Sequence, residues 1–284
     1  MMRLWKVLAA VLILALSAGS LTVAQDTEED FIARYLQDKP NKAVKEKQKV
    51  GWASVSFGMN RINRENDYNT FATLESEWIT GGSLSWLDRA LFFGGEAGTV
   101  FAKKFYVSLG GEYWLKLGEE LTGTFFYTRT GVPLTNPASE IKVMGAYLGA
   151  GWYLYNPPAV KEHVTRLTVR IGGTAGLYVA NWDLWPEYRN LNLATNTPVN
   201  ANTTFRGTAP GLTFNLGAEY PVGWAGLVAA LDVNYLYLNF KNVAWYNASD
   251  EEVVVTFDGT ADGRVDLALS GVRGKFEIKR YFNW

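Results

Sequence analysis

Charged side chains recur at two-residue spacing between apolar ones along much of this chain, and they are the groups that could do chemistry. The acidic positions are Glu96, Glu112, Glu219, Asp232, Asp266 and Glu277, and the basic ones are Lys116, Arg166, Arg170, Lys275 and Lys279. Carboxylates alone are a weak sign of acid–base catalysis, which depends on a base whose pKa lies near the working pH. Their meaning therefore depends on the elements that hold them.

The residues that usually carry hydrolytic or metal chemistry are scarce. The chain has one histidine, His163, and no cysteine. A serine hydrolase needs a histidine base beside its nucleophile, and transition metals favour imidazole and thiolate ligands. We therefore expect no enzyme activity, no catalytic residue, no metal site and no cofactor. Lys and Arg number 27 against 28 Asp and Glu, so the charge balance gives no reason to expect nucleic acid as a partner.

A period of two dominates the chain from residue 51 onward. Phe105, Val107 and Leu109 share one face of a predicted strand, while Ser108 and Glu112 share the other. Eight such runs are visible, at 52–60, 90–101, 105–117, 141–155, 166–179, 212–219, 227–240 and 265–284. Most have about the 9–11 residues that a tilted strand needs to cross hydrocarbon. The pattern predicts an all-β, antiparallel, up-and-down transmembrane barrel of eight strands.

The connections between the runs alternate between long and short, as expected of such barrels. Aromatic residues gather near both ends of the strands and predict two belts in the headgroup layers. Residues 71–79 and 253–257 could add strands, which leaves ten or more possible. In the last run the apolar parity slips near Gly271 and Gly274, which predicts a β-bulge or a glycine kink. A soluble β-sandwich or lipocalin-like barrel is the rival fold.

The N-terminal segments differ from the rest. Arg3 and Lys6 precede a short apolar run and the small residues that end at Ala24, which is the pattern of a signal peptide over 1–24. Residues 25–50 predict a periplasmic tail with a short amphipathic helix. This tail could bind a periplasmic protein, close the barrel or remain solvated. The barrel is predicted over 51–284.

The inner face of a narrow barrel would carry the charges. An eight-stranded barrel has an interior just wide enough for its own side chains, and an unpaired charge there is costly. We therefore expect a lumen charge network formed by Glu96, Glu112, Lys116, Arg166, Arg170, Glu219, Asp232 and Glu277. A narrow solute path or a small-ligand site is the alternative. In the third long connection, Trp182, Trp185 and Tyr188 could serve surface recognition, or could simply pack the loop.

The C-terminal strand ends in alternating aromatic and charged residues. Phe276, Ile278, Phe282 and Trp284 form a candidate assembly signal. With this ending, the chain resembles small outer-membrane β-barrel proteins of Gram-negative bacteria, the OmpX- and OmpW-like class with a porin-like fold. Most members of that class end in phenylalanine, whereas Asn283 and Trp284 follow Phe282 here. The resemblance implies outer-membrane lipid, periplasmic chaperones and the barrel-assembly machinery as partners.

These features favour a non-enzymatic barrel of the cell envelope with a structural or surface-interaction role. A narrow channel for small solutes is the first alternative. The second is an accessory subunit of an envelope complex that uses residues 25–50.

Overall fold

The computed structural model describes the barrel and parts of its connections. The described residues are 50–66, 68–69, 79–80, 86–102, 104–117, 124–127, 133–135, 139–158, 166–184, 203–222, 227–246, 251–253 and 265–283. The predicted signal peptide and all of the predicted tail except Val50 lie outside this set. No helix among the described residues is both long and apolar enough to cross a membrane.

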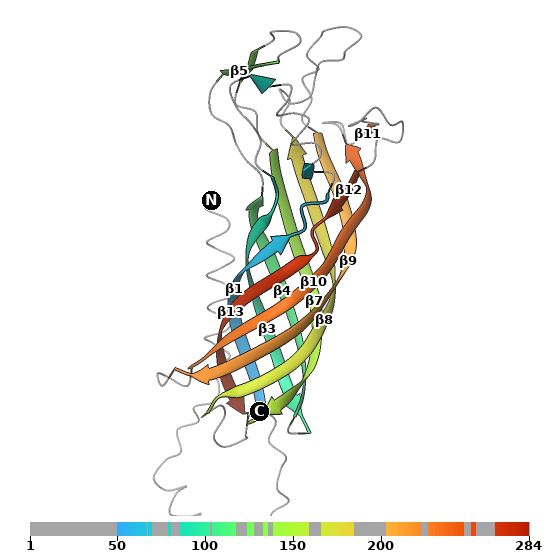
Figure 1. Cartoon of the computed structure of the whole chain (residues 1–284). Coiled ribbons are helices and arrows are strands. Elements are labelled where there is room, and N and C mark those ends of the chain that lie inside the picture. The colour runs from blue at the N-terminus through green and yellow to red at the C-terminus, as the bar shows by residue number, and fades with distance from the viewer. Residues whose placement is uncertain are drawn as a thin grey trace, which may run out of the picture.

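Eight long strands form a closed antiparallel barrel (Figure 1). They are β1 (Val50–Ile62), β3 (Arg89–Phe101), β4 (Phe105–Leu117), β7 (Ser139–Tyr155), β8 (Thr168–Leu184), β9 (Thr203–Pro221), β10 (Leu227–Tyr246) and β13 (Gly271–Asn283). Each strand pairs with the next along the chain, and β13 pairs with β1 from end to end, which closes the ring. The predicted fold class and the strand number of eight are confirmed.

The remaining described strands are short and do not enter the ring. β2 (Ile79–Thr80), β5 (Thr124–Tyr127) and β6 (Pro133–Thr135) form a separate three-stranded sheet, and Figure 1 shows β5 beyond the ends of the wall strands. β11 (Glu252–Val253) and β12 (Val265–Ala268) pair with the C-terminal part of β10. None of these short strands pairs with two wall strands, so they do not raise the strand number of the wall.

The connections fall into two sets, as predicted. β3 and β4, β7 and β8, and β9 and β10 are joined at one end of the barrel by short connections, at 102–104, 156–167 and 222–226. β1, β4, β8 and β10 all finish at the opposite end, and the long connections begin there. We call these the short-turn end and the long-loop end of the barrel.

The predicted bulge near Gly271 and Gly274 is wrong. The ladder between β10 and β13 keeps a single register. The same register continues to the Phe240–Leu267 pair of β12 and shifts only beyond it, between Phe240 and Val243. The apolar parity shifts in the sequence because Leu267 and Leu269 are apolar residues that face inward, where both are buried. The inner face changes from charged to apolar toward the long-loop end, while the strand itself keeps its alternation.

The outer wall of the barrel is apolar and exposed. Leu109 is 62% exposed, Phe214 is 75% exposed and Leu231 is 65% exposed, although all three lie in the middle of long strands. Charged residues alternate with them on the inner face, and most of those are buried. A soluble barrel buries its apolar face, whereas this arrangement suits hydrocarbon outside the wall. The predicted orientation of the two faces is confirmed.

The aromatic residues divide between the two faces, which corrects the predicted belts. Exposed aromatics lie on the outer face at the short-turn end (Phe101, Trp152, Tyr155, Tyr220) and toward the long-loop end (Tyr235, Tyr237). Several other aromatic residues near the strand ends, where the belts are predicted, are instead buried inside the barrel: Trp52, Phe92, Trp114, Tyr178 and Trp182. They occupy positions of the inner parity, so they fill the lumen instead of contacting headgroups.

A charge placed in the middle of the outer wall should destabilise the barrel in lipid. We expect Phe214→Arg to lower the free energy of unfolding by about 2–4 kcal/mol, because the guanidinium would face the bilayer midplane. Phe214→Leu, which keeps the position apolar, should cost much less. Urea titration of protein folded into lipid vesicles, followed by tryptophan fluorescence, measures both. Equal losses for the two variants would show that Phe214 does not face lipid.

Candidate functional site

The lumen is filled in three layers. Seven residues near the short-turn end form an apolar group that we call the short-turn cluster: Val50, Trp52, Val100, Tyr106, Tyr153, Val228 and Tyr281. A larger apolar group lies toward the long-loop end and includes Phe92, Trp114, Tyr178, Trp182, Leu236 and Leu269; we call it the long-loop cluster. The ionic layer lies between them and consists of Glu96, Glu112, Arg170, Glu219, Asp232, Arg273, Lys275, Glu277 and Lys279.

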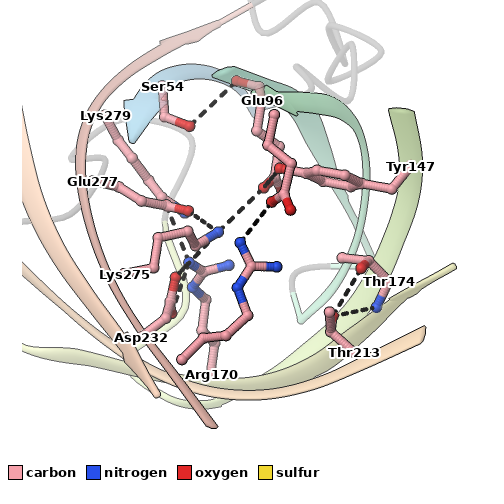
Figure 2. A network of polar contacts seen from close by, with 12 residues as sticks. Ser54, Glu96, Tyr147, Arg170, Thr174, Thr213, Asp232, Lys275, Glu277 and Lys279 are labelled. Carbon is pink, nitrogen blue, oxygen red and sulfur yellow. Dashed lines mark hydrogen bonds and ion pairs between the residues drawn. The ribbon is translucent and has the colours of Figure 1, made fainter. Parts of the chain in front are cut away.

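Arg170 is the centre of the ionic layer and is almost completely buried (Figure 2). Its Nε lies 3.0 Å from Glu219 Oε1, and its Nη2 lies 2.7 Å from Asp232 Oδ2 and 3.2 Å from Glu277 Oε2. The guanidinium also lies 5.7 Å from the centre of the Tyr106 ring. Arg170 comes from β8, whereas its partners come from β9, β10 and β13, so one side chain links four strands. Its planar fork of donors suits this role.

Two lysines of β13 complete this part of the layer. Lys279 Nζ lies 2.9 Å from Glu219 Oε1 and 3.0 Å from Glu277 Oε2. Lys275 is in contact with Glu277, and its Nζ lies 3.5 Å from Asp232 Oδ2. The Tyr281 hydroxyl donates a hydrogen bond of 2.5 Å to Glu219 Oε2. Each carboxylate here therefore has at least two charged or hydroxyl partners.

A second, smaller group adjoins the long-loop cluster. Arg273 Nη2 donates to Glu112 Oε2 at 2.8 Å, and Trp114 Nε1 donates to Glu112 Oε1, also at 2.8 Å. The Arg273 guanidinium lies 3.9 Å from the centre of the Phe92 ring. The ion pair is thus packed against aromatic faces, which favour a desolvated cation.

Ion pairs of this kind are costly to bury and more costly to break. Removing two charges from water costs several kcal/mol per ion, and the attraction in a low-dielectric interior offsets this only with good geometry. The described contacts have that geometry, with most charged atoms within 3.2 Å of an opposite charge. The layer is therefore best understood as a mutually dependent set, in which no member can be removed cheaply.

The structure places most of the charges predicted for the lumen in this layer. Glu96, Glu112, Arg170, Glu219, Asp232 and Glu277 lie there. Arg166 does not, since it precedes β8 at the short-turn end and is exposed. The side chain of Lys116 lies outside the described residues. Asp266 is exposed near the long-loop end and accepts a hydrogen bond from the backbone N–H of Asn242 at 2.8 Å.

Sequence reasoning missed two residues here. Arg273 is a member of the ionic layer, and Tyr281 contacts it through Glu219. Both keep the parity of Lys275, Glu277 and Lys279, which was a usable signal. The bulge that the sequence suggested nearby concealed it for Arg273. Tyr281 was hidden by its chemistry, because a tyrosine near a strand end is as typical of an aromatic belt as of a lumen.

Trp182 does not belong to an exposed recognition surface. It lies in β8, is 2% exposed, stacks on Phe205 with ring centres 4.7 Å apart and contacts the ring of Tyr68. It packs inside the long-loop cluster because its position has the inner parity. The other two candidates for recognition, Trp185 and Tyr188, lie outside the described residues.

Three residues of the candidate assembly signal lie on the outer face of β13. Phe276 is exposed there, and Ile278 and Phe282, at the same parity, are partly exposed. Trp284 lies outside the described residues. Their outward direction suits lipid contact along the strand that closes the barrel.

The described residues include no group of three or more His, Asp or Glu side chains arranged to hold a metal ion. The histidine of the sequence, His163, falls in the connection between β7 and β8, outside the described residues.

A closed antiparallel wall with an even number of strands, apolar outside and charged inside, is the architecture of proteins that cross a bacterial outer membrane. The exposed apolar wall decides between this class and a soluble barrel. The chain is an outer-membrane β-barrel.

Neither a protein-family model nor a curated protein matches the sequence. Solved structures similar to it include a major outer membrane protein from Thermus thermophilus (12% identity, TM-score 0.46, 82% of this chain and 99% of that one). OprG from Pseudomonas aeruginosa is 13% identical with a TM-score of 0.43, and the match covers 83% of this chain and 95% of that one. The outer membrane protease OmpT from Escherichia coli is 10% identical with a TM-score of 0.37, and the match covers 84% of this chain and 98% of that one. The likeness is one of fold.

Removing the central cation of the ionic layer should strongly destabilise the barrel. We expect Arg170→Met to lower the free energy of unfolding by about 3–5 kcal/mol, because it leaves buried carboxylates without their main partner. Arg166→Met makes the same change at an exposed site and should stay within about 0.5 kcal/mol of the unmodified protein. Urea titration of the detergent-folded protein measures both. A small effect at Arg170 would mean that the layer is open to water.

Proposed function

We propose that this outer-membrane β-barrel is non-enzymatic, has a closed lumen and acts as a structural or surface-interaction protein. The observation that carries the proposal is the filling of the lumen, in which an ionic layer lies between two apolar clusters. A barrel closed in this way presents its long connections without passing solutes.

The filling of the lumen supports a closed barrel over a channel. A water-filled path needs a continuous polar lining, as in the wide porins. Here the rings of Trp52 and Tyr106 pack edge to face within the short-turn cluster, with their centres 5.6 Å apart. Toward the other end, Trp114 and Trp182 are buried in the long-loop cluster. A solute would have to displace both clusters and break the ion pairs between them.

The long-loop end supports a role in surface interaction. All the long connections begin and end there, and the short sheet of β2, β5 and β6 joins the first of them to the second. Loops at one end of a rigid barrel are suited to binding because the scaffold fixes their bases. Trp185 and Tyr188 remain the candidate contact residues in the third connection.

The state of the buried carboxylates supports a non-enzymatic role. Glu219, Asp232 and Glu277 are held by cations of the ionic layer, whereas a general acid or base must be free to exchange a proton with substrate. The similar structure OmpT is a protease, but an activity of that kind does not follow from fold.

The partners of the barrel are part of the proposal. Outer-membrane lipid would contact the apolar wall, and the barrel-assembly machinery with its chaperones would recognise the outer face of β13. A periplasmic protein that binds residues 25–50 stays a prediction, since that segment lies outside the described residues except for Val50.

Electrical recording in planar bilayers tests the closed lumen. We expect the purified protein to insert without steady unitary currents, because the lumen filling excludes a hydrated path. A porin inserted in the same bilayers is the positive control, and a shift in electrophoretic mobility on heating shows that the protein was folded. Reproducible unitary currents from the folded protein would reject the closed lumen and favour a narrow channel for small solutes.

A further inference from the structure

Two arginines lie side by side on the outer face of the barrel at its long-loop end. Arg61 of β1 is directly opposite Arg89 of β3 in the ladder that joins these strands, and both residues are exposed. The backbone N–H of Ile62 donates to the carbonyl oxygen of Asp88 at 2.9 Å. Hydrogen-bonded and non-hydrogen-bonded pairs alternate along an antiparallel ladder, so Arg61 and Arg89 form a non-hydrogen-bonded pair, in which facing side chains come closest. Like charges placed directly opposite each other in this way destabilise a sheet.

The neighbours of this pair place it at the edge of the apolar wall. Met59 and Leu91 are the next residues of the outer face on the two strands; they lie opposite each other and are exposed. Phe93 follows on β3, with its ring centre 5.5 Å from that of Tyr113 on β4. Aromatic rings and long basic side chains both favour the headgroup layer of a membrane. The two guanidinium groups therefore lie at the level of the lipid headgroups, just beyond the hydrocarbon.

The protein itself neutralises this pair only in part. Asp88 Oδ1 lies 3.2 Å from Arg89 Nε, and Asp88 Oδ2 lies 3.5 Å from Arg64 Nη2. One carboxylate is therefore shared between two arginines. Within the part of the chain that the structure describes, no carboxylate forms an ion pair with Arg61. The repulsion between Arg61 and Arg89 is thus left without a matching anion from the described residues.

A lysine at a comparable place on the other side of the barrel is fully neutralised. Lys142 of β7 lies on the outer face beyond the apolar wall, next to the exposed Met144 of the same face. Its Nζ lies 3.4 Å from Glu140 Oε1 and 3.5 Å from Asp183 Oδ2. Two carboxylates therefore serve one cation on this side. The contrast marks the arginine pair of β1 and β3 as a place that suits an external anion.

We propose that Arg61 and Arg89 form a binding site for the phosphate group of an anionic lipid in the leaflet at the long-loop end. A planar guanidinium donates parallel hydrogen bonds to phosphate oxygens, and a phosphate between two guanidinium groups removes their repulsion. The acyl chains of the same lipid would lie against Met59 and Leu91, which connect the site to the apolar wall and favour a lipid over a free anion. The site rests on the proposed contact of the wall with outer-membrane lipid, which Phe214→Arg tests separately.

Native mass spectrometry of the detergent-folded protein tests the ligand. We expect the protein to retain phosphatidic acid in preference to phosphatidylcholine, whose phosphate carries its own cation. Arg61→Gln should weaken the binding of phosphatidic acid roughly tenfold, because it removes charge-assisted hydrogen bonds. Lys142→Gln makes the same change in charge on the same outer face and should bind as the unmodified protein does. Equal retention of the two lipids, equal losses in the two variants, or inorganic phosphate bound as tightly as the lipid would overturn the proposal.

Stability in vesicles gives an independent readout, because the direction of the effect should depend on the lipid. In phosphatidylcholine alone, Arg61→Gln should raise the urea midpoint of unfolding, since it removes one of two opposed like charges. In vesicles that also contain phosphatidic acid, it should lower the midpoint, since it removes a ligand of the folded state. Lys142→Gln breaks two ion pairs and should lower the midpoint in both. If Arg61→Gln shifts the midpoint in the same direction in both lipids, the phosphate site is rejected, whereas the closed lumen is unaffected.

Discussion

The pairing of β13 with β1 is the constraint on which the rest of this structure depends. Hydrocarbon offers no hydrogen bonds to a strand edge, so a β-sheet crosses a membrane only when its first and last strands join. Closing the ring with eight strands leaves an interior about as wide as the side chains that line it. The inner face must then be filled, and its charges must find partners within the barrel. The ionic layer follows from closure combined with small strand number.

The fold was predictable because the same alternation recurs in every wall strand. Each run with apolar residues at every second position matched a strand, and the long and short connections gave the same strand number independently. The outward direction of Leu109 and Phe214 followed from that alternation. Burial in lipid imposes it strictly, since a polar residue on the outer face costs free energy in every strand.

The interior was less predictable because alternation tells which face a residue lies on only where the two faces differ in polarity. At both ends of the lumen they do not differ. Trp52 and Trp182 are as apolar as the residues that face lipid, so the sequence could not separate a belt from a lumen cluster. Leu269 misled in a related way. It is an apolar residue that faces inward, so it suggested a bulge and obscured the inner position of Arg273. Which charged residues pair across the lumen depends on the height of each residue in the barrel. The tilt and stagger of the strands determine that height, and alternation does not reveal it.

The ionic layer also has a consequence for the register of the closing seam. Lys275, Glu277 and Lys279 alternate along β13 and reach partners on several other strands. A slip of one residue between β13 and β1 would turn all of them toward lipid, at about 2–4 kcal/mol for each lysine near the midplane. The same slip would turn Phe276 and Ile278 into the ionic layer. The network that is costly to bury therefore makes the correct closure far more favourable than its nearest alternatives, which is a contribution to specificity more than to stability.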